Sequence, residues 1–279
     1  MNKANQMIDG NNFIRHHLKN NIPFAAGKIG GNELQILHFA ISKNNNWHPQ
    51  FKRECEEVAG LYPMDLKNAT WFKDTLLTDL HHLDLIPLWS KTAPAFEEQI
   101  ISRYAKNAYT TKLQHLEPYF FDNPWTDFLS DKTVAVFSPF ADSIQQNFNN
   151  LNKIWGEKIT NNFNLITVKY PTSIPITANS PYTESKEIYN EYINIIKNTN
   201  FDVGIFGTGH TGLLFALECK KLNKTGIHLG GPTQILFGIH GNRWQSMSEF
   251  TPLFNQHWTS PMKHETPEKF YDVEGGCYW

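Results

Sequence analysis

The sequence predicts an α/β fold in which helices flank a mostly parallel sheet. Short apolar runs of the kind that form buried strands alternate with longer segments of helical periodicity over most of the chain. Glycine or proline turns follow several of these runs. Because repeated strand–helix–strand units form right-handed crossovers, this alternation predicts parallel pairing.

The first half of the chain contains segments of both kinds. They are strands at 22–29 and 84–89, and helices at 32–42, 51–62, 69–83 and 93–105. In the first helical segment, Leu34, Leu37 and Ile41 have spacings that place them on one face. Pro94 suits the first turn of the last segment, since proline has no N–H to donate there.

The second half is more regular. It contains strands at 132–140, 163–171, 201–206 and 225–231, and helices at 142–155, 180–198, 213–223 and 232–241. Ser180 is the expected N-cap of the long helix, with Pro181 at its first position. We expect one α/β domain over 1–279, with a weak boundary between lobes at 122–130, where the pattern breaks.

Composition and charge exclude several classes of protein. A net charge of −2 provides no basic field for a nucleic acid backbone. The three cysteines are far apart without zinc-ligand spacing, so we interpret them as reduced thiols. The amino terminus lacks the apolar core of a signal peptide, and no run approaches the roughly 18 apolar residues of a membrane helix. We expect a cytoplasmic protein, which, if it serves a membrane pathway, does so from the inner membrane face, and a homodimer is left open.

Four turns fall at the carboxyl ends of predicted strands. They are Ser138-Pro139, Gly30-Gly31, Gly207-Gly209 and Gly230-Gly231. Ligands of parallel α/β sheets bind beyond these strand ends. We therefore expect the four turns to meet around one crevice.

The segment "GTGHTG" at 207–212 matches the G-x-G-x-x-G pattern between a strand and a helix. One interpretation is a phosphate site that includes Thr208, His210 and Thr211, because N–H groups at a helix start suit an anion. A dinucleotide site also needs an acid at the end of the next strand, and "IHLGG" has none. The remaining interpretation is a tight turn with close helix–strand packing.

Three further positions have both a chemical and a structural interpretation. Gln234 lies in the first turn of a predicted helix, near any ligand at its end. Arg243, beside Trp244, could bind a phosphate or form an ion pair within the protein. Asp142, just after Ser138-Pro139, could cap a helix or act as a base on an acceptor hydroxyl. No HExxH metal spacing and no G-x-S-x-G elbow occurs.

The segments "KIGGNEL", "HLGGPTQILFGIHGNRW" and "EGGCYW" resemble uncharacterised proteins of bacterial surface-polysaccharide gene clusters, which in turn resemble the GT-D glycosyltransferases. The resemblance implies a single Rossmann-like α/β domain of GT-D-like fold. It also implies transfer of a sugar from a nucleotide donor.

The GT-D signature R-F-G-D-G-E contains a D-x-E pair that handles a divalent metal and the donor diphosphate. Laid on it, Lys28 takes the Arg position, Gly30 the first glycine and Glu33 the Glu, whereas Gly31 replaces the Asp and Asn32 the second glycine. One carboxylate is a poor site for a hard dication. Either Mn²⁺ or Mg²⁺ is held by Glu33, diphosphate and water, or Lys28, Arg243 and helix N-termini neutralise the diphosphate without metal.

The resemblance implies a glycosyltransferase that moves a sugar from a nucleoside diphosphate sugar to a hydroxyl of a glycan or lipid-linked glycan. Glu33 and Asp142 are the expected acid/base or metal groups, and 207–211 and 230–234 the expected diphosphate loops. Trp244 and Phe140 could stack on base or sugar. Without the resemblance, Glu33 would be a first-turn acid that stabilises its helix through the dipole. A non-catalytic sugar-nucleotide-binding protein and a dinucleotide-dependent oxidoreductase stay as alternatives, and the stereochemical outcome is open.

Overall fold

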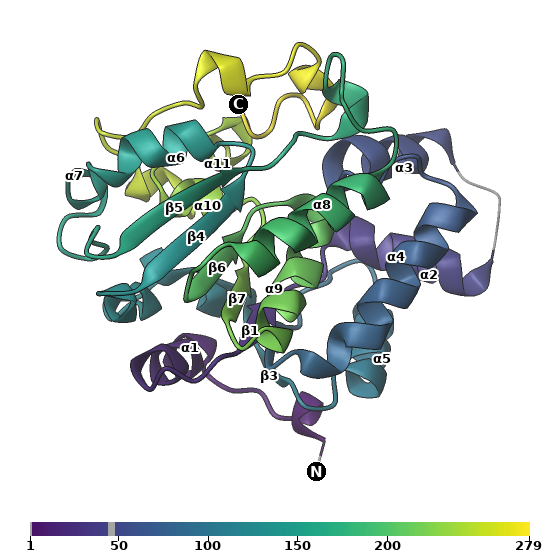
Figure 1. Cartoon of the computed structure of the whole chain (residues 1–279), viewed down its shortest axis with the longest axis horizontal. Helices are drawn as coiled ribbons and strands as arrows, with labels where there is room; N and C mark the ends of the chain where they lie inside the picture. The colour runs from purple at the N-terminus through teal and green to yellow at the C-terminus, as the bar shows by residue number, and fades with distance from the viewer. Residues whose placement is uncertain (1, 44–47) are drawn as a thin grey trace.

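Seven strands form one sheet in the order β3-β2-β1-β7-β6-β4-β5 (Figure 1). The computed structural model describes residues 2–43 and 48–279. The strands are β1 (Ala25–Gly27), β2 (Leu85–Pro87), β3 (Tyr109–Thr111), β4 (Thr133–Ser138), β5 (Asn164–Lys169), β6 (Val203–Phe206) and β7 (Thr225–His228). Within these ranges every pairing between strands is parallel, which confirms the predicted Rossmann-like α/β class.

Helices cover both faces of this sheet. They are α1 (Gly10–Lys19), α2 (Gly31–Ser42), α3 (Pro49–Glu54), α4 (Leu66–Asp79), α5 (Pro94–Tyr104), α6 (Ala141–Phe148), α7 (Leu151–Trp155), α8 (Ser185–Asn198), α9 (Gly212–Lys221), α10 (Thr233–Leu236) and α11 (Asn242–Gln245). One core cluster joins the sheet to α1, α6, α7, α10 and α11, and two others join it to α2, α4, α5, α8 and α9.

The alternation of side chains along β4 shows how the sheet separates these clusters. Val134 and Val136 belong to the cluster on one face, whereas Ala135 and Phe137 belong to a cluster on the other. Successive residues of a strand point to opposite faces, so a strand covered on both faces is a continuous apolar run. This is why the sequence pattern identified the central strands.

Several local predictions were wrong. The strand β3 and the helix α1 were not predicted, and the helix expected at 142–155 is divided into α6 and α7. The long helix α8 begins at Ser185 rather than near Pro181. Its N-cap is Glu184, which exchanges hydrogen bonds with Glu187 in a capping box, so Ser180 is not the cap.

The segment proposed as a lobe boundary is part of the main core. It contains the short helix Trp125–Leu129, and Trp125 and Leu129 are fully buried there. The division of the chain into lobes, like the single domain over 1–279, stays a prediction.

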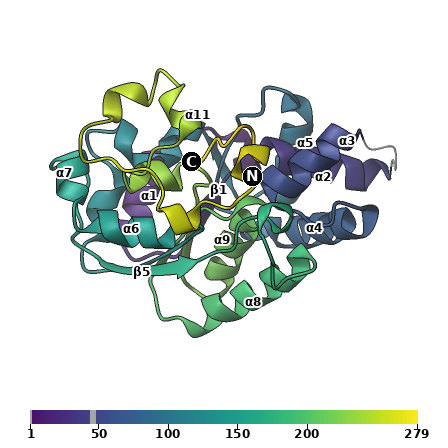
Figure 2. The same cartoon turned by 90° about the horizontal axis from the view of Figure 1, so that it is seen from above.

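The C-terminal segment crosses the edge of the sheet toward which the strands point. It is drawn in yellow in Figures 1 and 2 and contains short 3₁₀ turns such as Thr251–Leu253 and Lys263–Glu265. Gln234 Nε2 donates a hydrogen bond to the Tyr278 carbonyl at 2.8 Å, which joins this segment to α10.

All three cysteines are buried free thiols. Cys219 is a buried residue of α9, whereas Cys277 lies in the C-terminal segment. No helix in the described ranges is both long enough and apolar enough to cross a membrane.

We predict that Gly226→Ala destabilises the fold strongly. A Cβ atom at Gly226 in β7 would lie 2.5 Å from the Cα atom of Ala216 in α9, and backbone cannot move aside as a side chain can. Overpacking of this kind costs about 1–3 kcal/mol or more. The measurement is the free energy of unfolding in urea.

The matched control is Gly31→Ala, because a Cβ atom at Gly31 would meet nothing within 4 Å. We expect it to change stability by less than about 0.5 kcal/mol. Equal effects of the two substitutions would contradict the close helix–strand contact.

Candidate functional site

A pocket of about 760 Å³ lies at the carboxyl edge of the sheet. Every strand delivers a residue to it from the turn that follows, and these residues, from β1 to β7, are Lys28, Trp89, Lys112, Pro139, Tyr170, Gly207 and Gly230. The volume is within the range of about 300–1,000 Å³ that small-molecule sites occupy. Parallel pairing therefore builds a single site from turns that are far apart in the sequence.

The structure brings most of the predicted site residues together here. Those that line the pocket are Lys28, Gly30, Gly31, Asn32, Glu33, Ser138, Gly207, Thr208, Gly209, His210, Gly230, Gly231, Gln234, Arg243 and Trp244. Thr211 and Asp142 are not among its lining residues. The four strand-end turns thus meet around one crevice.

The glycines of "GTGHTG" are explained by close packing. A Cβ atom at Gly207 would lie 3.0 Å from Thr233, and one at Gly209, whose φ is +56°, would lie 2.5 Å from the Ala59 carbonyl oxygen. A Cβ atom at Gly212 would overlap the imidazole of His228. The pattern thus has the tight-turn role that was one of its two interpretations.

These turns present unused polar groups to the pocket. The backbone N–H groups of Thr208, Gly209 and Gly231 donate no hydrogen bond to any other part of the described chain. The hydroxyls of Thr208 and Thr233 are buried and have no partner there either. Unpaired donors converging at a strand end are a suitable setting for an anion.

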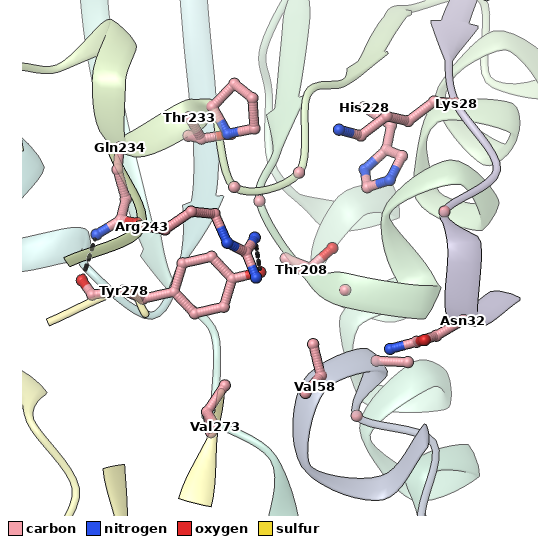
Figure 3. Close-up of a pocket in the computed structure, with 18 of the residues that line it drawn as sticks. Lys28, Asn32, Val58, Thr208, His228, Thr233, Gln234, Arg243, Val273 and Tyr278 are labelled. Atoms are coloured by element: carbon pink, nitrogen blue, oxygen red, sulfur yellow. Dashed lines mark hydrogen bonds between the residues drawn. The ribbon is translucent and has the colours of Figure 1, made fainter. Parts of the chain in front are cut away.

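Lys28 supplies a positive charge beside these turns. Its side chain extends from the end of β1 toward the turn at Gly230, next to His228 (Figure 3). The ammonium lies 5.2 Å from the centre of the Trp89 ring and has no carboxylate within 4 Å among the described residues. Burial lowers the pKa of Lys28, whereas Glu117 and Glu33 raise it.

Five glutamates line the pocket with Lys28, and two of them, Glu33 and Glu117, have charges that act on its ammonium. Glu33, in the first turn of α2, folds back over Gly30, and burial raises its pKa against the effects of its own N–H group and of Lys28. Glu117 is only 5% exposed, and the Tyr119 hydroxyl donates a hydrogen bond to it. Burial raises the pKa of Glu117 as well, so both acids are poised to take up a proton more readily than a surface carboxylate.

His228, the last residue of β7, is a neutral group in this pocket. Its Nδ1 lies 3.2 Å from the Phe206 carbonyl oxygen, which can only accept, so Nδ1 carries the proton and Nε2 is a free acceptor. Burial and the nearby Lys28 lower the pKa of His228 to about 3. It therefore adds no positive charge at neutral pH.

His210 and Thr211 have structural partners. His210 Nδ1 donates to the Ala59 carbonyl oxygen at 2.9 Å, and burial lowers its pKa to about 4. Thr211 is fully buried and bonds to the Tyr170 hydroxyl at 2.9 Å, away from the pocket surface. The phosphate contacts predicted for both residues stay predictions.

Arg243 is already engaged within the protein. Its guanidinium pairs with Glu274. It also donates a hydrogen bond to the Tyr278 hydroxyl at 3.1 Å, which Figure 3 shows. The Trp244 indole donates to Gln234 Oε1 at 3.1 Å, and both side chains are buried. Through these contacts, Arg243, Trp244 and Gln234 hold the C-terminal segment in place as one wall of the pocket. Arg243 thus forms the ion pair within the protein that was one of its two interpretations.

Asp142 lies outside the pocket, in the first turn of α6, and its carboxylate is half-exposed and 2.7 Å from His264 Nε2. It does not cap that helix. The N–H groups of Asp142 and Ser143 donate instead to the buried carboxylate of Glu265. The predicted capping role was therefore wrong, and the predicted role as a base has no support from this position.

The described chain contains one group of three ligand-type side chains close enough for a metal ion, Asp142, His264 and Glu265. It lies away from the turns at Gly207 and Gly230, and α6 already uses the Glu265 oxygens. Glu33 belongs to no such group within the described ranges. The residues around Glu33 therefore do not fit the divalent ion that the sequence resemblance implied.

Glu117 and Tyr278 were not predicted as site residues, and Thr233 was included only as part of the expected diphosphate loop at 230–234. Glu117 lies between two short 3₁₀ turns, and Tyr278 lies in the C-terminal segment, where the sequence has little periodicity. His228 was not predicted as a site residue either. The signal for it was the pair of glycines, Gly27 and Gly212, whose missing side chains leave room for its ring.

Comparison with solved structures gives a similarity over nearly the whole chain. It is to a selenomethionine-substituted structure of domain of unknown function 1792 (DUF1792), with 10% sequence identity and a TM-score of 0.46, covering 94% of this chain and 93% of the other. No protein-family model and no curated protein matches the chain. The name of that domain assigns no activity, so function has to be argued from the residues of this chain.

We predict that His228→Asn weakens the pH dependence of stability in acid. Unfolded histidine binds a proton below about pH 6.5, whereas folded His228 resists protonation down to about pH 3. The unfolded state binds more protons in this window, so the stability that neutral His228 allows is present above pH 6.5 and lost as pH falls. Within this window, His228 contributes about 1.4 kcal/mol per pH unit to the slope of the unfolding free energy against pH.

The measurement is urea unfolding of wild type and variant between pH 4.5 and 7.5. The difference between the two curves is informative, because Glu33 and Glu117, with raised pKa values, contribute with the opposite sign. Parallel curves would contradict a neutral, buried His228.

Proposed function

We propose that this protein is a glycosyltransferase that transfers a sugar from a nucleoside diphosphate sugar to a hydroxyl group of a glycan or lipid-linked glycan acceptor. The observation that carries the proposal is the charge pattern of the strand-end pocket. Lys28, an ammonium with no carboxylate within 4 Å among the described residues, lies beside turns whose N–H groups are unused there. The half-buried Glu33 and the buried Glu117 line the same pocket. This pattern suits a diphosphate next to a site of proton transfer.

The groups divide into two functional parts. The N–H groups at Thr208, Gly209 and Gly231, together with Lys28, would bind the donor diphosphate. Trp89 and Phe120, which line the pocket near Lys28 and Glu117, offer aromatic surface to a sugar or base. The sequence resemblance to GT-D enzymes supports the same division, since it places Lys28 and Glu33 at the donor.

The reaction requires one proton acceptor. The acceptor oxygen forms a bond to the anomeric carbon, the bond from that carbon to the diphosphate oxygen breaks, and its electron pair leaves with the diphosphate. The acceptor proton passes to a carboxylate. Glu33 and Glu117 are the carboxylates whose charges act on Lys28, and each is a candidate for this role because burial raises its pKa.

The oxidoreductase alternative has less support. The strand after the "GTGHTG" turn ends in His228, so no acid is present there to bind a ribose. The other alternative is a non-catalytic binder of sugar nucleotides, and turnover measurements distinguish it from a glycosyltransferase.

We predict that a nucleoside diphosphate or its sugar conjugate raises the melting temperature. A ligand that binds only the folded state, at one hundred times its dissociation constant, adds about 2.7 kcal/mol of stability. The measurement is a thermal-shift screen of ADP, CDP, GDP, UDP and dTDP and their common sugar conjugates, with NADH as the comparison. Stabilisation by NADH alone would contradict the proposal.

We predict that Glu33→Gln or Glu117→Gln lowers turnover about 10²–10⁴-fold while donor binding is retained, because loss of a general base has this effect. The measurement is release of nucleoside diphosphate from the donor identified by the screen. Asp142→Asn is the matched control, since this carboxylate lies outside the pocket. Donor binding without turnover by wild type, with its acceptor present, would favour the non-catalytic binder.

A further inference from the structure

The positive charge of the diphosphate end comes from Lys28. Arg243 lines the same pocket, but Glu274 and the Tyr278 hydroxyl already engage its guanidinium. His228 and His210 are neutral near pH 7. Lys91 and Lys112 also line the pocket but are exposed. Lys28 is thus the half-buried cation that directly adjoins the turn at Gly230.

Five glutamates line the pocket, but among the described residues none of them belongs to a group of three ligand-type side chains close enough for a metal ion. Glu117 and Glu33 are the two acids whose charges act on Lys28. A hard dication needs about six oxygen ligands, and a dication here would also be repelled by the ammonium. Gly31, next to Asn32 and Glu33, contributes no side-chain oxygen, and a Cβ atom there would meet nothing within 4 Å.

We propose that the donor diphosphate is bound without a divalent cation, and that the Lys28 ammonium provides the counter-charge which a metal ion would otherwise supply. This inference rests on the proposed function. When the anomeric bond breaks, its electron pair and the added negative charge stay on the diphosphate. Lys28 stabilises that charge by attraction and hydrogen bonding, with no transfer of its proton, and the unused N–H groups at Thr208, Gly209 and Gly231 complete the site.

The test measures binding of the nucleoside diphosphate that gives the largest thermal shift, by calorimetry on the full chain. It uses metal-free buffer with EDTA and, separately, buffer with 2–5 mM MnCl₂ or MgCl₂. We expect binding in EDTA to be at least as tight as binding with either metal, because Mn²⁺ and Mg²⁺ complex the free diphosphate in solution. Inorganic pyrophosphate is a second probe and should likewise bind in EDTA, because it contains the charged group without the base.

The variants are Lys28→Met, Lys28→Arg and Lys153→Met. Methionine keeps much of the side-chain volume and removes the charge, so we expect Lys28→Met to weaken binding at least tenfold in EDTA, which corresponds to about 1.4 kcal/mol. Arginine restores a cation and should recover part of the loss. Lys153 is exposed on α7, outside the pocket lining, and Lys153→Met should bind like wild type.

The outcomes separate this inference from the proposed function. Binding that disappears in EDTA and returns with Mn²⁺ or Mg²⁺ would overturn the inference and leave the glycosyltransferase proposal intact. Wild-type affinity in a folded Lys28→Met protein would also overturn it. Failure of every nucleoside diphosphate and sugar conjugate to bind in any buffer would overturn both.

Discussion

The position of His228 depends on space that Gly27 and Gly212 leave open. A Cβ atom at Gly27 would lie 2.7 Å from the Cβ atom of His228, and one at Gly212 would overlap its ring. The contact joins β1, β7 and the start of α9 at the place where their turns enter the pocket. If either glycine had a side chain, the histidine would have to move, and the turn at Gly230 would move with it. The geometry of the site therefore depends on how closely the backbone at Gly27 and Gly212 approaches His228.

The cationic side chains Arg243 and Lys28, which both line the pocket, differ in whether they already have a partner within the protein. Arg243 binds the C-terminal segment through Glu274 and Tyr278, so it is a structural cation although it faces the pocket. Lys28 has no such partner in the part of the chain that the structure describes. A charge held away from water and left unpaired is unfavourable unless a ligand arrives to pair with it. A lysine of the same pocket that is exposed to water, as Lys112 is, does not have this unfavourable contribution.

The sequence predicted the fold class because its central strands are covered on both faces. Runs such as Val134 to Phe137 are apolar throughout, and the turns after them contain glycine or proline. It did not predict β3, whose three residues "YTT" form no apolar run. It misplaced the start of α8, because Ser180-Pro181 is a common helix-start signal and the reciprocal bonds of Glu184 and Glu187 cannot be recognised without coordinates.

The site was predictable to the extent that it consists of strand-end turns. The topology of parallel sheets places such turns together whatever their distance in the sequence, so Gly30, Gly207 and Gly230 could be assigned to one crevice. Glu117 could not, because it lies in an irregular segment whose path follows from tertiary packing alone. The roles of Asp142 and Arg243 were undecidable for a similar reason. Their partners, His264 and Glu274, are 122 and 31 residues away, and no local pattern connects them.

The buried thiols make it possible to observe separate parts of the molecule by chemical labelling. Thiol reagents attack the thiolate, and burial raises the pKa of Cys277 to about 12 and that of Cys219 further still, so neither reacts quickly while covered. Cys219 is a buried residue of α9, so its labelling rate reports on disruption of the packing between this helix and the sheet. Cys277 belongs to the wall that Arg243 holds, so its labelling rate reports on partial release of that wall while the remainder stays folded.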